Sequence, residues 1–252
     1  MGRGALVLAA GMSKRFRMTA GTSKQAATLS RIPLICYPLT SLALSGVSEV
    51  MVVTAPGMDS TIRHYALSCP ASPEVEVITV SEPWRGNGYT FAVAAWTMLN
   101  YRGRTCSIVS MMDHVYPPSL AERVASSGCN SVGVDYEARY VDRGEATRVA
   151  FIGGVLALGK HLPTSNPVDV GVHMLSADVA MAAFRCSFEG EIGLSDVITC
   201  ASRLGVDVRL ADVTGTPWSE VDNLDDLREL EAGRRRAVLD SVLGEWRSRG
   251  AV

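Results

Sequence analysis

Lysine is scarce in this sequence, and a surplus of positive charge is missing. The 252 residues carry 24 basic and 26 acidic side chains, which gives a net charge of −2. Only Lys14, Lys24 and Lys160 among the basic residues are lysines. A protein that binds nucleic acid needs excess positive charge to neutralise phosphates. We therefore expect no nucleic-acid partner, and we note that two of the three lysines fall in one early loop.

The sequence also lacks a C-x-x-C pair and any long apolar run. Its six cysteines are widely spread and without zinc-site spacing, so we expect buried free thiols, as in a reducing cytosol. The longest obvious apolar run, residues 150–158, is far short of the roughly 18 residues that cross a bilayer. A buried first strand explains the apolar N-terminus better than a signal peptide does. These absences predict a cytoplasmic protein without membrane insertion.

The residues that are present suit a folded α/β chain. Hydrophobic residues make up 47% and charged residues 20%, which is enough for a sizeable core and argues against disorder. Apolar runs that predict strands alternate with stretches of helical character. The expected strands are residues 4–9, 49–54, 75–80 and 105–112, and the expected helices are 33–46, 58–68 and a segment from 88 to about 100. Between the first strand and the first helix, residues 10–32 predict a long polar loop.

The second half of the chain has a different pattern. Residues 130–176 indicate short β segments that need not be parallel. Helices are expected near 177–185 and 193–204, and a strand at 206–213. Asn223 can cap a last helix, whose helically spaced apolar residues run from Leu224 to Trp246. Periodicity alone therefore indicates an alternating α/β chain with a β-rich middle.

The first loop contains small and basic residues directly after a buried strand. Small residues let the backbone approach a bulky anion, and exposed amides in such a turn bind phosphate oxygens. Arg15 adds a planar fork suited to pyrophosphate, and Lys24 adds a point charge. This pattern indicates a phosphate site, with an ordinary solvated basic loop as the alternative.

A second glycine-containing loop, residues 84–90, joins a strand to a helix. Its two glycines permit close approach of a ligand, and the start of the helix supplies free amides. A turn that only reverses the chain is the alternative.

Two aspartates stand where a metal ion could bind. Asp113 follows a buried strand, and ligands of open α/β sheets collect outside the carboxyl ends of strands. Asp222 lies just before the last helix. Mg²⁺ sites use one or two carboxylates together with phosphate and water, so the two aspartates could share one ion. Either alone could instead be a cap or turn residue.

Charged residues also surround the β-rich middle. Glu145 and Asp169 could bind hydroxyl groups, and Arg148 and Lys160 could bind a phosphate. Together they would suit a polyol phosphate, although charged hairpin ends are common.

Several of these segments resemble known motifs. The first loop resembles the L-A-A-G-x-G-t-R-l pattern of nucleotidyltransferases that make nucleoside-diphosphate sugars and alcohols, with Gly11, Arg15 and Lys24 in matching places. Ser13 and Ser23 depart from the glycine and proline of that pattern. The strings G-N-G-Y, M-M-D-H-V-Y, E-A-T-R-V and W-S-E-V-D-N are similar to those of one subgroup, the archaeal-type inositol-1-phosphate cytidylyltransferases. The resemblance runs from Leu6 to about Leu227.

This resemblance implies a fold and an activity. The fold would be a Rossmann-like nucleotidyltransferase fold of the α/β class, with a mixed, mostly parallel central sheet and helices on both faces. Residues 1–252 would form a single domain in which residues 130–176 are a small β-rich acceptor lobe. The enzyme would transfer CMP from CTP to 1L-myo-inositol 1-phosphate, giving CDP-inositol and pyrophosphate for the synthesis of di-myo-inositol phosphate.

The resemblance also implies residue roles. Arg15 would bind the leaving phosphates and Lys24 the α-phosphate, and Asp113 and Asp222 would hold Mg²⁺. His114 is interpreted as a structural or positioning residue rather than a general base. The implied nucleotide-binding residues are Ala9, Ala10, Gly11, Met12, Ser13, Asn87, Gly88, Thr90 and Asp113. The implied acceptor-binding residues are Glu145, Arg148, Lys160 and Asp169.

Other functions stay open at this point. The acceptor could be phosphocholine, a phosphonate or a sugar 1-phosphate, although a choline site needs an aromatic cage and only Tyr136, Tyr140 and Phe151 are at hand. A non-catalytic nucleotide-sensing protein is an alternative from another class. A homodimer stays open. If the enzyme stands alone, a separate membrane-bound transferase must consume its product.

Overall fold

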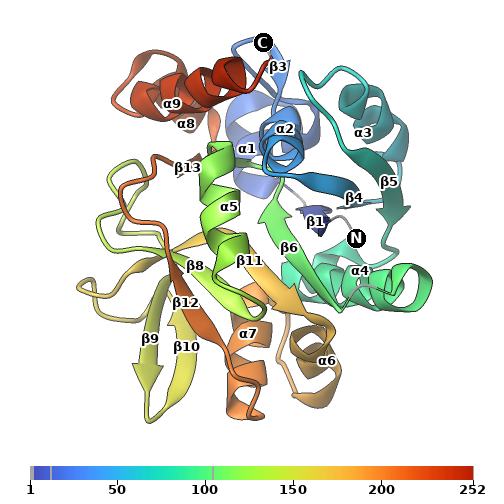
Figure 1. Cartoon of the computed structure of the whole chain (residues 1–252), viewed down its shortest axis with the longest axis vertical. Coiled ribbons are helices and arrows are strands. Elements are labelled where there is room, and N and C mark those ends of the chain that lie inside the picture. The colour runs from blue at the N-terminus through green and yellow to red at the C-terminus, as the bar shows by residue number, and fades with distance from the viewer. Residues whose placement is uncertain (1–2, 12, 104, 252) are drawn as a thin grey trace.

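A mixed β-sheet runs through the whole molecule (Figure 1). The computed structural model describes residues 3–11, 13–103 and 105–251. Within these residues, nine strands form the sheet, with the main order β10-β9-β11-β6-β1-β4-β5, and β8 pairs with both β11 and β12. This arrangement confirms the expected α/β class.

The first half of the sheet is parallel. Its strands are β1 (Arg3–Ala9), β4 (Val47–Thr54), β5 (Glu74–Thr79) and β6 (Cys106–Met111). They pair in parallel as β6-β1-β4-β5. Because parallel strands end at the same edge, the segments after β1 and β6 come together there.

Helices cover both faces of this parallel half. Alternate residues of β1 enter different cores, with Val7 on one side and Leu6 on the other. The Val7 side packs against α2 (Cys36–Leu44), α5 (Pro118–Ser126) and α9 (Arg236–Ser248). The Leu6 side packs against α4 (Asn87–Arg102), α6 (Ala177–Arg185) and α7 (Leu194–Arg203). In Figure 1, α2 and α9 lie above the strands, and α4, α6 and α7 lie below them.

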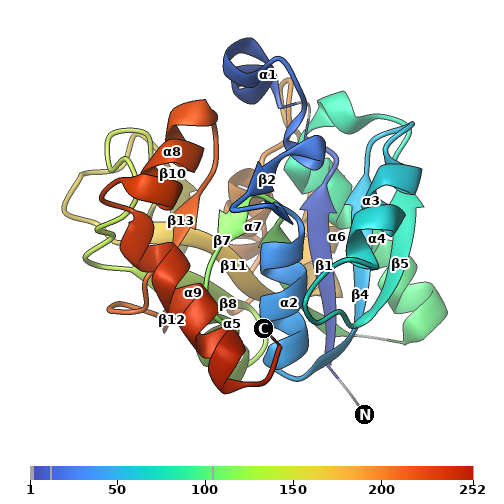
Figure 2. The ribbon, with the colours of Figure 1, turned by 90° about the horizontal axis from the view of Figure 1, so that it is seen from above.

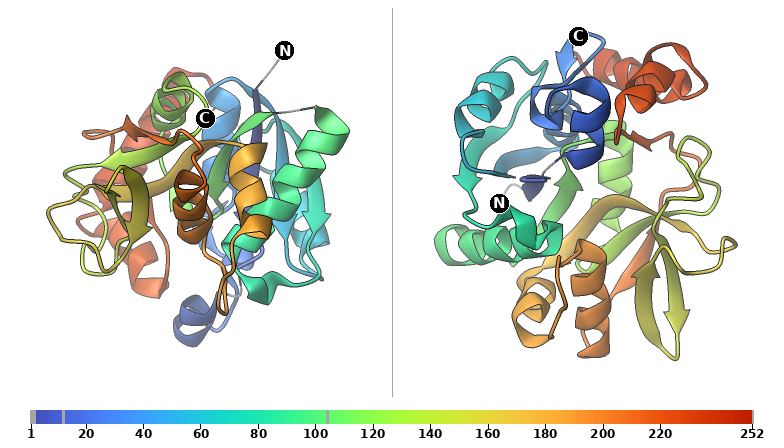
Figure 3. Two further views of the ribbon diagram at one scale, coloured as in Figure 1. Left: turned by 90° about the horizontal axis from the view of Figure 1, so that it is seen from below. Right: turned by 180° about the vertical axis from the view of Figure 1, so that it is seen from behind.

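The remaining strands extend the same sheet. They are β8 (Ser131–Asp135), β9 (Arg148–Ile152), β10 (Val155–Gly159), β11 (Val168–Ser176) and β12 (Arg209–Asp212). Strand β11 is antiparallel to β6, and its register with β8 shifts between Asp169 and His173, where Gly171 has φ +64°. The β9–β10 hairpin and β5 lie at opposite ends of the sheet (Figure 3).

Short elements complete the chain. The helical turn η2 (Pro83–Arg85) precedes α4, and α3 (Asp59–Ala66) lies between β4 and β5. Strand β7 (His114–Val115) pairs antiparallel with β13 (Ser219–Glu220).

Two expectations about local structure are wrong. Residues 10–32 are not a plain loop, because they contain α1 (Lys14–Ala20), η1 (Lys24–Ala26) and the β2–β3 hairpin (Thr28–Leu29, Ile32–Pro33). Helix α1 lies beyond the carboxyl ends of the parallel strands (Figure 2). The last helix is two helices, α8 (Leu224–Ala232) and α9, since the backbone is extended at Gly233. Asn223 caps α8 as expected, accepting from the backbone N–H groups of Asp225 and Asp226.

The cysteines are paired, so the expectation of free thiols is wrong. Disulfides join Cys36 to Cys69, Cys106 to Cys129 and Cys186 to Cys200. The sequence separations of 33, 23 and 14 residues carry no pairing signal, because tertiary packing alone brings each pair together. None of the helices that the structure describes is both long and apolar enough to cross a bilayer.

Thiol titration tests this pairing. Protein that is purified and unfolded in guanidinium without reductant should show no reactive thiol, and six after reduction. Each closed loop restricts the unfolded chain and stabilises the fold by about 2–4 kcal/mol, so reduction should also lower the melting temperature. Six reactive thiols before reduction would contradict the pairing.

Candidate active site

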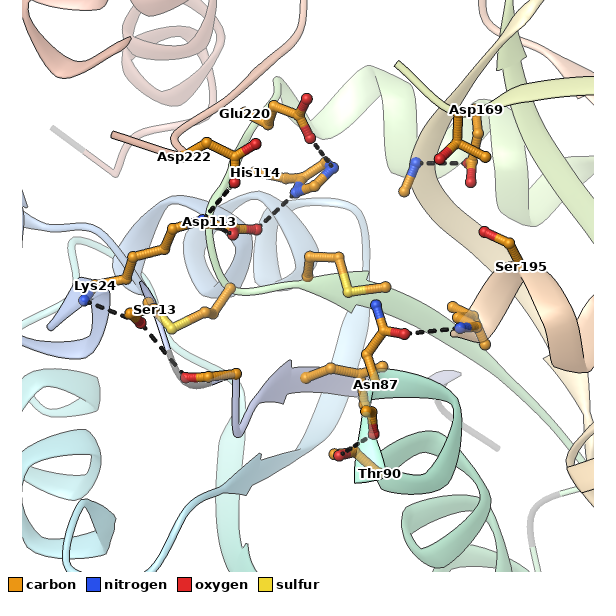
Figure 4. Close-up of a pocket in the computed structure, with 18 of the residues that line it drawn as sticks. Ser13, Lys24, Asn87, Thr90, Asp113, His114, Asp169, Ser195, Glu220 and Asp222 are labelled. Carbon is orange, nitrogen blue, oxygen red and sulfur yellow. Dashed lines mark hydrogen bonds and ion pairs between the residues drawn. The ribbon is translucent and has the colours of Figure 1, made fainter. Parts of the chain in front are cut away.

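A cavity of about 630 Å³ lies at the carboxyl edge of the parallel strands. Ligand sites of this size are common in enzymes. Its walls come from the ends of β1 and β6, the first loop, the starts of α4 and α7, strand β11 and the segment after β13 (Figure 4). The cavity therefore stands at the switch region of an open α/β sheet, where such folds bind ligands.

The ammonium group of Lys24 joins two carboxylates in this cavity. Its Nζ lies 2.7 Å from Asp113 Oδ2 and 2.7 Å from Asp222 Oδ1. Arg15 Nη2 lies 2.7 Å from the other oxygen of Asp222. The Lys24 side chain is only 11% exposed, whereas that of Arg15 is 58% exposed. The structure thus brings together four groups that were predicted from the sequence. We call them the Lys24 cluster: Arg15, Lys24, Asp113 and Asp222.

A short strand pair places the two aspartates side by side. Asp113 stands between β6 and β7, and Asp222 follows β13, the partner strand of β7. The Val221 N–H donates to the Asp113 carbonyl at 3.0 Å. The backbone N–H of Asp222 donates a hydrogen bond to Asp226 Oδ2 at 2.8 Å. Asp222 is therefore positioned by the start of α8 without being its cap, and its side chain remains available to the cavity.

Gln25 fixes the loop that carries Lys24. Its Nε2 donates to the carbonyls of Ala9 at 2.8 Å and Gly11 at 3.0 Å, so the loop is tied to the end of β1. Ser13 Oγ accepts the Lys24 N–H at 3.3 Å. Gln25 is buried, and its bonds hold the first loop against the end of β1.

Mutual attraction keeps Lys24 and Asp113 ionised despite their burial. Burial alone would lower the pKa of Lys24, but the carboxylates of Asp113 and Asp222 outweigh it and raise the pKa above its usual value. Burial would raise the pKa of Asp113, but the Lys24 ammonium and the hydrogen bond from His114 hold it well below the usual range. Lys24 and Asp113 are therefore both charged at neutral pH.

His114 contacts the carboxylate oxygen of Asp113 that Lys24 does not contact. Its Nδ1 lies 2.9 Å from Asp113 Oδ1, and its ring stacks on Trp218 with 8° between the planes. Burial lowers the pKa of His114, yet the bond to Asp113 and the charge of Glu220 raise it overall. Gly171 leaves room for the ring, because a Cβ there would lie 2.3 Å from Nε2. These contacts agree with a positioning role for His114.

The carboxylate oxygens of Asp113 and Asp222 that contact Lys24 are suited to a divalent cation. A cation already lies between the two carboxylates in the form of the Lys24 ammonium. No group of three or more His, Cys, Asp or Glu side chains with metal-site geometry occurs among the described residues. Two carboxylates with substrate phosphate and water match the preference of Mg²⁺, which uses few protein ligands. Asp113 and Asp222 could therefore hold such an ion.

One arm of the cavity is formed by the starts of two helices. Asn87, Thr90 and Gly86 contribute from α4 and its N-cap, and Leu194 and Ser195 from α7. A Cβ on Gly88 would lie 2.5 Å from the Gly193 carbonyl oxygen, so only glycine permits this close packing. The Thr90 hydroxyl donates to the Gly86 carbonyl at 3.0 Å.

The other arm is charged. It is lined by Glu145, Lys160 and Asp169, with Thr147 and His173 beside them. Lys160 Nζ lies 3.3 Å from Glu145 Oε2, and both side chains are exposed. Asp169 Oδ1 accepts the Gly171 N–H at 2.9 Å. This arm offers both an ammonium group and carboxylates to a ligand.

Most of the expected site residues line the cavity, but three do not. Those that do are Ala10, Gly11, Ser13, Arg15, Lys24, Asn87, Thr90, Asp113, Glu145, Lys160, Asp169 and Asp222. Ala9 is fully buried beneath the loop, and Gly88 packs against Gly193. Arg148 is 2% exposed and donates to the carbonyls of Ala146, Lys160 and Arg143, so it supports the charged arm and does not line it. Met12 lies outside the described residues.

The sequence analysis missed several lining residues. They include Leu8, Gln25, Thr147, His173, Glu191, Leu194 and Ser195. Gln25 directly follows Lys24, and this adjacency was an available signal. The residues at the start of α7 had none, because only the tertiary packing of α7 against α4 brings them to the cavity.

The fold and the site define a nucleotidyltransferase domain. The parallel sheet, the loop after its first strand and the charged cluster at its carboxyl edge are the features that carry this assignment. The chain belongs to the family of the MobA-like NTP transferase domain, whose model matches residues 5–187.

Curated relatives show which members of the family the chain is similar to. It is 33% identical over 232 residues to the "Bifunctional IPC transferase and DIPP synthase" of Rubrobacter xylanophilus, covering 90% of this chain and 51% of the relative. The protein of the same name from Archaeoglobus fulgidus is 28% identical, with 89% and 42% covered. The chain thus spans about half the length of these relatives. The likeness inferred from the motifs is confirmed.

A solved structure confirms the fold. The inositol-1-phosphate CTP transferase from T. maritima superposes with a TM-score of 0.80 at 24% identity, covering 95% of this chain and 96% of that one. The mixed sheet with helices on both faces is therefore a nucleotidyltransferase fold.

Replacing Arg148 tests its structural role. Arg148→Met should lower the free energy of unfolding by about 1.5–3 kcal/mol, because carbonyls bonded to a charged group lose their donor. Lys160→Met serves as the matched control; its exposed ion pair should contribute about 0–1 kcal/mol. Urea unfolding measures both, and equal small effects would show that Arg148 does not stabilise the charged arm of the cavity.

Proposed function

We propose that the protein transfers CMP from CTP to 1L-myo-inositol 1-phosphate, giving CDP-inositol and pyrophosphate. The observation that carries the transferase assignment is the Lys24 ammonium shared by Asp113 and Asp222 at the carboxyl edge of the sheet. The names of the relatives and the motifs in the charged arm support the choice of base and acceptor.

In this proposal the cavity holds two substrates that meet at one phosphorus. The arm at Asn87 is suited to a flat nucleobase, and the arm at Glu145 and Lys160 to a polyol phosphate. The Lys24 cluster lines the same cavity. We propose that residues 130–176 act as the acceptor lobe within a transferase domain spanning residues 1–252.

In this mechanism an oxygen of the inositol phosphate attacks the α-phosphorus of CTP. The new phosphorus–oxygen bond forms as the bond between the α-phosphorus and the bridging oxygen to the β-phosphorus breaks, and pyrophosphate leaves in line. A phosphate oxygen is already ionised near neutral pH, so the nucleophile needs no general base. The structure is consistent with this, because the ring of His114 is hydrogen-bonded to Asp113 and is given no role as a base.

The charged side chains stabilise the transition state. Mg²⁺ held by Asp113 and Asp222 would neutralise negative charge on the phosphates when bound. Lys24 then exchanges a carboxylate partner for an α-phosphoryl oxygen, where negative charge develops. Arg15 and the backbone amides of Gly11 and Ser13 stabilise the leaving pyrophosphate. Positioning and electrostatics supply most of the acceleration in such transfers.

The alternative acceptors differ in what the charged arm must supply. A choline group needs aromatic faces, but Tyr136, Tyr140 and Phe151 do not line the cavity. A sugar 1-phosphate has hydroxyl groups and a phosphate, as inositol 1-phosphate does, so only turnover separates the two. A nucleotide-sensing protein would have little need of the Lys24 cluster, which therefore favours an enzyme.

A substrate panel tests the function. The protein is incubated with Mg²⁺, each nucleoside triphosphate and each phosphorylated alcohol, and pyrophosphate is measured. We expect release with CTP and inositol 1-phosphate, with phosphocholine and sugar 1-phosphates well below. Turnover with another acceptor would correct the substrate, and no turnover with any pair would overturn the enzyme assignment.

Lys24→Ala should lower kcat by about 10²–10³, as does the loss of one preorganised donor at a developing charge. Arg203→Ala removes an exposed charge from the far end of α7 and is the control expected to leave kcat unchanged. Circular dichroism should show that both variants are folded. Near-native turnover of Lys24→Ala would remove Lys24 from the mechanism.

A further inference from the structure

The side-chain amide of Asn87 is held in one orientation by the start of α7. Its Oδ1 accepts the backbone N–H of Leu194 at 2.7 Å. Leu194 is the first residue of α7, and the N–H groups in a first turn have no acceptor within their own helix. Only the oxygen of an amide can accept this hydrogen bond. The amide nitrogen of Asn87 therefore points away from Leu194 and into the cavity (Figure 4).

The backbone around this contact is closely packed. The Gly88 N–H donates to the Ile192 carbonyl at 2.9 Å, and the Ile192 N–H donates to the Arg85 carbonyl at 2.8 Å. A Cβ on Gly86 would lie 2.3 Å from the Ile192 carbonyl oxygen. The starts of α4 and α7 are thus joined backbone to backbone, and Asn87 cannot turn its amide over without leaving the Leu194 N–H unpaired.

The nitrogen of this amide is available to a ligand. Among the hydrogen bonds between described residues, Asn87 Nδ2 donates to no protein acceptor, and the residue is exposed to the cavity. Its neighbour Thr90 is buried, and its hydroxyl is already used by the Gly86 carbonyl. Asn87 therefore presents a fixed NH₂ donor on the arm that we assign to the nucleobase.

We propose that Asn87 selects cytosine by donating a hydrogen bond to N3 of the base. This inference rests on the proposed function. N3 of cytosine is an acceptor, whereas N3 of uracil or thymine carries a hydrogen and is a donor. Two donors would face each other if UTP bound in the same way, and each would lose its partner. An amide whose orientation is fixed by the Leu194 N–H discriminates between these bases. An amide that could rotate by 180° would accept both.

The substitution Asn87→Asp reverses the polarity of this contact. One carboxylate oxygen can still accept the Leu194 N–H, and the other presents an acceptor to the base. We measure kcat/KM for CTP and UTP with inositol 1-phosphate and Mg²⁺. The ratio of the two values should fall by about 10–10², the factor that follows from one unpaired group, and UTP should be used better relative to CTP. Asn87→Ala supplies neither polarity, so its ratio should lie between the other two.

An unchanged ratio in Asn87→Asp would overturn this inference. Equal losses with both nucleotides would mean that the amide contacts an atom common to both bases, such as O2. The proposed function fails separately, if the unaltered protein turns over no nucleotide. If Asn87→Asp has no activity with either substrate, calorimetric Kd values for CTP and UTP with Mg²⁺ replace the kinetic ratio, and a Kd ratio equal to that of the unaltered protein also rejects the selection.

Discussion

The site depends on one ammonium group placed between two carboxylates. Without Lys24, the side chains of Asp113 and Asp222 would repel each other in a partly buried cavity. Their attraction to Lys24 overcomes the unfavourable effect of burial on its charge. The arrangement also suits the proposed function, which needs an ammonium group and two carboxylates at one point of the cavity.

The sheet makes this meeting possible. Three segments far apart in sequence reach one edge of it: the loop after β1, the turn after β6 and the segment after β13. The antiparallel β7–β13 pair brings the last of these to Asp113, and Gln25 ties the first to the end of β1. The fold thus brings Lys24, Asp113 and Asp222 close together, while the local motifs provide their charges.

The sequence allowed prediction of the charged cluster because Lys24, Asp113 and Asp222 each stand in a recognisable local setting. It could not predict the disulfides, since nothing local indicates that Cys106 meets Cys129. Nor could it distinguish Arg148, which is buried among carbonyls, from Lys160, which lines the cavity, because the two have the same charge. The break at Gly233 was also hidden, since the apolar spacing continues through it. Local pattern therefore predicted which charged groups meet in the cavity, and it predicted burial poorly.

The close packing between the starts of α4 and α7 limits how the cavity of such an enzyme can change during evolution. Gly86 and Gly88 leave no space for larger side chains, because carbonyl oxygens of the facing segment stand where a Cβ would be. The width of that part of the cavity is therefore set by main-chain atoms, which substitutions do not readily move. New ligand preferences in this part of the cavity would have to evolve through the few side chains at its rim, because the main chain there would stay in place.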